Sequence, residues 1–118
     1  MDASQMPASL RARMAEKQSR PPLEKVRSLL RSHVADTDGW VEVRDELRMT
    51  LQHSAWPLRE GLEAIDAVLA AELPAGTLLR MVAGDAGWPL DDDPTDAGAA
   101  EFLRELSELI RSLLAEEP

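Results

Sequence analysis

The side chains in this sequence that could carry chemistry are two histidines and a dense group of carboxylates. His33 and His53 each lie near the end of a predicted helix, where a histidine interacts favourably with the helix dipole. Neither belongs to a recognisable catalytic or metal-binding motif. The chain contains no cysteine, which excludes a thiol nucleophile, a disulfide scaffold and a cysteine-ligated metal. We therefore expect a protein that is not an enzyme and that has no cofactor and no bound metal.

Two aspartate-rich turns, at 36–39 and 91–96, have the carboxylate density that a calcium ion requires. An EF-hand loop needs Gly at its sixth position and Glu at its twelfth. A loop that starts at Asp91 has Asp96 and Phe102 there, and the first turn departs from the pattern in the same way. The spacing therefore does not predict a calcium site.

The acidic cluster around the second turn has two interpretations. It can be a solvated loop that caps the last helix and keeps the protein soluble. Alternatively it is a docking patch, in which carboxylates attract a basic protein and a tryptophan beside a proline provides an apolar anchor. The candidate partner-binding residues are Asp85, Trp88, Asp91, Asp92, Asp93, Asp96 and Trp56.

The overall charge favours a basic partner. The 118 residues include 22 acidic and 13 basic side chains, a net charge of −9. Residues 1–33 hold seven basic and three acidic side chains, a local charge of +4 that leaves −13 for the rest. A chain with this balance is not expected to bind nucleic acid or an anionic membrane. With no apolar stretch long enough for a signal peptide or a membrane span, we expect a cytoplasmic protein.

Hydrophobic periodicity predicts helices along most of the chain. Residues 1–21 form a basic arm, mobile or a short helix, and 22–118 form an acidic helical domain. The predicted helices are 22–34, a segment from Asp38 to His53, one from Ser54 to Leu73, a short one at 77–82, and one from Thr95 or Asp96 to about Ala115, with Asp38, Ser54, Thr77 and Thr95 or Asp96 as caps. Trp40 opens an apolar helix face, which places it in the core. The predicted fold is all-α, a compact bundle of five or six helices with no sheet.

The order of these segments resembles a known family. The run 58–69, a Pro-Ala-Gly turn, a short helix at 77–80, a turn rich in Trp, Pro and Asp, and the segment 101–106 are similar in layout to small α-helical immunity proteins of bacterial contact-dependent growth inhibition systems. The likeness covers about residues 23–115. Where that family usually has an aromatic pair and two prolines, this chain has Gly-Trp-Pro-Leu at 87–90 and an Asp triplet.

The resemblance implies a protein that binds and neutralises a cognate toxin domain, often a nuclease. The charge is consistent with this function, because a nuclease presents Lys and Arg to phosphates and an acidic protein can occupy the same surface. The alternative is a non-catalytic adaptor or a homodimer that associates through an apolar helix face made of Leu58, Leu62, Ile65 and Leu69.

Overall fold

Helices make up the regular secondary structure of the computed structural model, which describes residues 20–116. The elements are α2 (Pro22–His33), α3 (Trp40–His53), α4 (Trp56–Ala70), α5 (Thr77–Leu79), the π-helical turn η2 (Arg80–Asp85) and α6 (Asp96–Glu116). No strand forms between residues 20 and 116. The predicted all-α bundle is therefore confirmed. The predicted basic arm, residues 1–21, lies outside the described residues except for Arg20 and Pro21.

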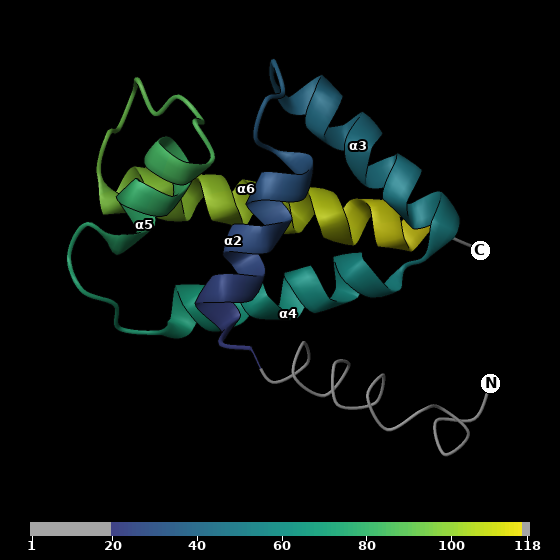
Figure 1. Cartoon of the computed structure of the whole chain (residues 1–118), viewed down its shortest axis with the longest axis horizontal. Coiled ribbons are helices and arrows are strands. Elements are labelled where there is room, and N and C mark those ends of the chain that lie inside the picture. Colours follow the sequence, from purple (N-terminus) through teal and green to yellow (C-terminus); the bar gives the residue numbers. More distant parts are fainter. Residues whose placement is uncertain (1–19, 117–118) are drawn as a thin grey trace.

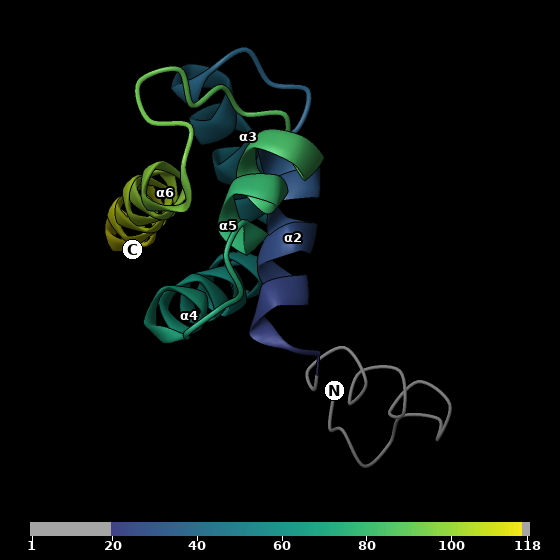
Figure 2. The ribbon, with the colours of Figure 1, turned by 90° about the vertical axis from the view of Figure 1, so that its left-hand side faces the viewer.

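The longest helix, α6, runs beside α4 in the opposite direction (Figure 1). α2 crosses both at a steep angle and packs closely on α4 (Figures 1 and 2). α3 lies across the end of the bundle where α4 begins and α6 ends, and α5 with η2 lies at the other end (Figure 1). Across residues 20–116, no helix combines the length and the apolar character needed to cross a bilayer.

The residues at the starts of the helices agree only in part with those predicted from the sequence. Pro22 occupies the first turn of α2, where its missing N–H costs nothing. At α3 the prediction was wrong, because the cap is Gly39 and the backbone N–H of Asp38 donates to the Glu42 carboxylate instead. At α4 the cap residue is Ala55 and not the predicted Ser54, although the Ser54 hydroxyl does accept the N–H of Trp56, the first residue of the helix, at 3.2 Å.

The core is one continuous cluster to which every long helix contributes. Its fully buried large side chains include Leu30, Val34, Val43, Leu47, Leu58, Ile65, Met81, Leu103, Leu106 and Ile110. Two residues of the apolar face proposed for an adaptor or homodimer, Leu58 and Ile65, are completely buried, and Leu62 and Leu69 pack against the same cluster. The apolar helix face that a partner was predicted to cover is therefore part of the protein's own core.

The close crossing of α2 and α4 depends on Gly61. A Cβ placed there would lie 3.0 Å from one methyl carbon of Leu29 and 3.2 Å from the other. Gly61 is buried, as is Leu29. The missing side chain thus lets the two helices approach until Leu29 rests on the α4 backbone.

We predict that Leu106→Ala lowers the free energy of unfolding by about 2–5 kcal/mol, because it removes a fully buried side chain and leaves a cavity. Met49→Ala is the control, since Met49 is 59% exposed on α3, and it should change stability by less than about 0.5 kcal/mol. Urea unfolding of both variants gives the comparison. Equal effects would mean that the assigned core is wrong.

Candidate functional site

Three consecutive aspartates, Asp91, Asp92 and Asp93, form an exposed part of the predicted docking patch. We call them the acidic turn. They lie in the loop between η2 and α6, and all three are exposed. Within residues 20–116 none of them forms an ion pair with a Lys or Arg side chain. Three adjacent carboxylates therefore repel one another without a nearby cation to compensate.

The acidic turn is tied to the first turn of α6 by short local bonds. The Thr95 hydroxyl donates to Asp93 Oδ1 at 2.5 Å, and the Thr95 N–H donates to the Asp93 carbonyl at 2.9 Å. Thr95 also accepts the N–H of Gly98 on its hydroxyl at 3.3 Å, which makes it the cap of α6. A Cβ on Gly98 would lie 1.9 Å from the Asp93 carbonyl oxygen. The loop can therefore lie against the helix only because residue 98 is a glycine.

Asp96 has a different role from the one predicted for it. Its Oδ2 accepts the N–H of Gly76 at 2.7 Å and its Oδ1 accepts the N–H of Leu79 at 2.9 Å. These backbone bonds, first from Gly76 and then from Leu79, hold the pKa of the Asp96 carboxyl below its usual value. Asp96 therefore accepts N–H groups at the start of α5. Of the two predicted caps of the last helix, Thr95 and not Asp96 has that role. The predicted Thr77 cap of the short helix was wrong, because Gly76 is the cap residue of α5, in a left-handed conformation.

Asp85 is partly neutralised within the fold. Its Oδ2 lies 3.2 Å from Nε of Arg27 on α2, close enough for an ion pair, although this N–H has no hydrogen-bond partner. Both side chains are more than a third exposed, so the pair contributes little to stability. It does reduce the charge that Asp85 offers to a partner.

Trp88 packs inside the molecule against two other aromatic rings. Its ring centroid lies 4.9 Å from that of Trp40 and 4.9 Å from that of Phe102, and the latter two are 5.2 Å apart. The cluster joins α3, the loop before the acidic turn and α6. Trp40 is half-buried against the core, in agreement with its predicted place. Trp88 is half-buried against the core too, so contacts inside the protein use much of the surface that was predicted to bind a partner.

Trp56 belongs to a separate surface. It is 57% exposed at the start of α4, and α4 begins at the opposite end of the bundle from the loop that precedes α6 (Figure 1). The predicted site therefore divides into three parts: the acidic turn, with Trp88 before it and Asp96 after it; Asp85, paired with Arg27 of α2; and Trp56 on another face. Thr95 was predicted as one of two candidate caps of the last helix, and its bond with the Gly98 N–H agrees with that prediction. Sequence reasoning missed Gly98, whose role depends on the close approach of the Asp93 carbonyl.

The described part of the chain is acidic. Residues 20–116 contain nineteen Asp and Glu against ten Lys and Arg, a net charge of −9. Among these residues no three His, Asp or Glu side chains are arranged to hold a metal ion. The site can therefore attract cationic groups by its field, through several separate carboxylates.

No family model, curated protein or solved structure matches this chain. The resemblance to immunity proteins stays a prediction, and the function has to be inferred from the residues themselves.

We predict that Gly98→Ala destabilises the fold by about 1–3 kcal/mol, because the new Cβ would overlap the Asp93 carbonyl oxygen and force the backbone to move. Gly84→Ala is a matched control, since a Cβ there meets nothing within 4 Å. It should be neutral or stabilise the protein by up to about 1 kcal/mol. Urea unfolding distinguishes the two, and a Gly98→Ala variant as stable as wild type would contradict the assigned packing of the turn.

Asp96→Asn should destabilise the protein at neutral pH and have a smaller effect in acid. The pKa of Asp96 is lower in the folded state than in the unfolded chain. Its contribution is therefore complete above about pH 4 and is lost as the pH falls through the folded-state pKa. Urea unfolding at a series of pH values from 7 to 2 measures this, with Asp91→Asn as the exposed control. An effect of Asp96→Asn that stays constant over this range would show that its charge does not stabilise α5.

Proposed function

We propose that this chain is a non-enzymatic binding protein that neutralises a cognate basic toxin domain of the nuclease type. The observation that supports this most directly is the acidic turn. Its three aspartates are exposed, have no cationic partner within residues 20–116, and lie on a loop held by Thr95, Gly98 and the aromatic cluster.

A rigid acidic loop is suited to this task for an energetic reason. Binding costs free energy when loops must become ordered, and a loop that is ordered beforehand avoids much of that cost. The repulsion among the three carboxylates is relieved when Lys and Arg side chains of a partner approach them. The free protein thus keeps a charge arrangement that only a cationic surface would compensate.

A nuclease provides such a surface. Its substrate channel must present Lys and Arg to phosphate groups. An acidic protein that covers the channel replaces the phosphates and blocks the substrate, and the net charge of −9 over residues 20–116 accelerates the encounter.

Affinity capture from the native host tests this proposal. We expect the wild-type chain to retain a basic protein at low salt, to release it as the salt concentration rises, and to inhibit its nuclease activity. Replacing Asp91, Asp92 and Asp93 by Asn should weaken this binding by about tenfold or more.

The matched control changes the same number of charges elsewhere. Glu63, Glu105 and Glu108 are exposed on α4 and α6, and their replacement by Gln should leave affinity for the captured partner nearly unchanged. Equal losses in the two triple variants would assign the effect to net charge alone. A captured partner that is active as a nuclease in the complex would contradict neutralisation.

A further inference from the structure

The structure brings together two aspartate-rich turns that are far apart in the sequence. The turn at 36–39 follows α2, and the acidic turn lies before α6. Trp40, directly after the first turn, has its ring centroid 4.9 Å from that of Trp88, which lies three residues before Asp91. Figures 1 and 2 both show the loop after α2 and the loop before α6 on the same side of the molecule. The acidic surface therefore extends to a second loop.

A pocket of about 300 Å³ lies between the end of α2 and the end of η2, lined by residues 34–37 and 84–88. We call it the Asp36 pocket. α2 ends at His33 and η2 ends at Asp85, so two helical segments end beside this pocket. The C-terminal end of a helix carries the negative end of its dipole, which attracts cations. The half-buried indole of Trp88 forms part of the wall.

The charged groups that line the Asp36 pocket are carboxylates. Asp36 and Asp85 belong to the lining, which includes no Lys, Arg or His. Asp85 pairs with Arg27, which lies outside the lining. Asp36 is exposed and forms no ion pair with a Lys or Arg side chain within residues 20–116. A group that enters this pocket therefore meets the free carboxylate of Asp36 and no positive charge from the wall.

The hydroxyl in the pocket is also suited to a donor. Thr37 Oγ1 donates its hydrogen to the Val34 carbonyl at 2.6 Å, so toward the pocket this oxygen has only lone pairs to offer. Together with the carboxylate of Asp36 and the face of the Trp88 indole, it favours a cation that carries several N–H groups.

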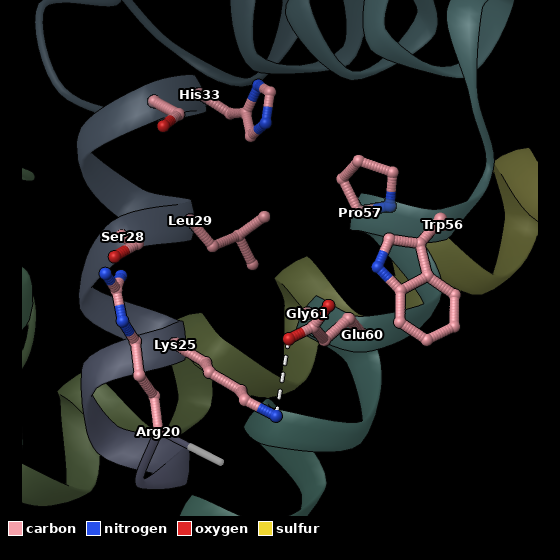
Figure 3. A pocket seen from close by; sticks show the side chains of 10 residues that line it. Arg20, Lys25, Ser28, Leu29, His33, Trp56, Pro57, Glu60 and Gly61 are labelled. Carbon is pink, nitrogen blue, oxygen red and sulfur yellow. Dashed lines mark ion pairs between the residues drawn. The ribbon is translucent and has the colours of Figure 1, made fainter. Parts of the chain in front are cut away.

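A larger groove, of about 400 Å³ between α2 and α4, does not have this character. Its charged lining includes Arg20, Lys25 and Glu60. Lys25 Nζ lies 3.3 Å from Glu60 Oε1, in an ion pair that the groove's two walls form with each other (Figure 3). Leu29 is 6% exposed and fills the space beside Gly61. The groove therefore selects neither a charged nor an apolar ligand, unlike the Asp36 pocket.

We propose that the Asp36 pocket binds one arginine side chain of the partner protein. This inference deepens the proposed function and rests on it, because the partner has to be cationic. The guanidinium donates to the Asp36 carboxylate and lies with its flat face on the Trp88 indole. Arginine fits these two contacts better than lysine, since its planar group both stacks on aromatic rings and donates several hydrogen bonds in one plane.

The Asp36 pocket and the acidic turn have different tasks in this arrangement. The acidic turn attracts a basic surface through its field, which does not distinguish one Lys or Arg from another. The Asp36 pocket takes up a single side chain, and an arginine that is enclosed in this way is a common hot spot of protein interfaces. A metal ion is not the expected ligand, because no three His, Asp or Glu side chains within residues 20–116 are arranged to hold one.

An NMR titration of the full chain with N-acetyl-arginine amide tests the proposal. In 0.15 M salt, where remote charges are screened, we expect saturable shifts at the amides of Asp36, Thr37 and Gly87 and at the indole N–H of Trp88. N-acetyl-citrulline amide, which has a similar shape and no charge, should not shift them.

Two variants separate the pocket from net charge. Asp36→Asn should weaken binding of the arginine amide about fivefold. Asn also tolerates the left-handed backbone of residue 36, whose φ is 65°, so the loop should keep its conformation. Glu63→Gln removes one exposed charge on α4, outside the pocket, and should change binding by less than about twofold.

Three results would overturn the proposal: equal shifts with the arginine and citrulline amides, unchanged binding to Asp36→Asn, or shifts at these resonances with calcium chloride and none with the arginine amide. Affinity capture with wild type and Asp36→Asn separates this inference from the proposed function. A basic partner that both retain equally contradicts the pocket alone. If no basic partner is captured while the arginine amide binds as expected, the proposed function fails and the pocket's selectivity for arginine stands.

Discussion

The acidic end of this molecule depends on two hydrogen bonds that the Asp96 carboxylate accepts from the backbone N–H groups of Gly76 and Leu79 at the start of α5. α5 has three residues before it widens into η2, too few to be stable by helix formation alone. Its first N–H groups need acceptors, and Asp96 supplies two of them from the start of another helix, twenty positions along the chain from Gly76. A negative charge at this place also complements the dipole of α5. These bonds join the two ends of the segment from Gly76 to Asp96, which contains η2, Trp88 and the acidic turn.

Contacts on both sides of the loop hold the three adjacent aspartates of the acidic turn in place despite their mutual repulsion. The aromatic cluster supports one side of the loop, while Thr95 and Gly98 hold its other side against α6. The carboxylates of the acidic turn remain outside these contacts, apart from the bond between Asp93 and Thr95. At the other end of the bundle, Trp56 is 57% exposed at the start of α4, beside a groove between α2 and α4.

Sequence patterns predicted the helices because each long helix has an apolar stripe that the core buries. These patterns gave wrong predictions where the contacts of a side chain are with residues far away in the sequence. Asp96 was assigned to its own helix because capping rules consider neighbouring residues, whereas its partners are Gly76 and Leu79. Trp88 was predicted as a partner-binding anchor because it lies beside a proline in a turn, yet it packs on aromatic rings from α3 and α6. The groove beside Trp56 depends on the crossing of α2 and α4 at Gly61, which local sequence does not indicate.

The proposed function requires the acidic turn to be rigid before any partner arrives. Backbone ¹⁵N relaxation of the free protein measures this at the amides of Asp91, Asp92 and Asp93. We predict order parameters near those of the helices, about 0.8 or higher. Values below about 0.6, typical of a flexible loop, would contradict the account, because the loop would then have to become ordered on binding.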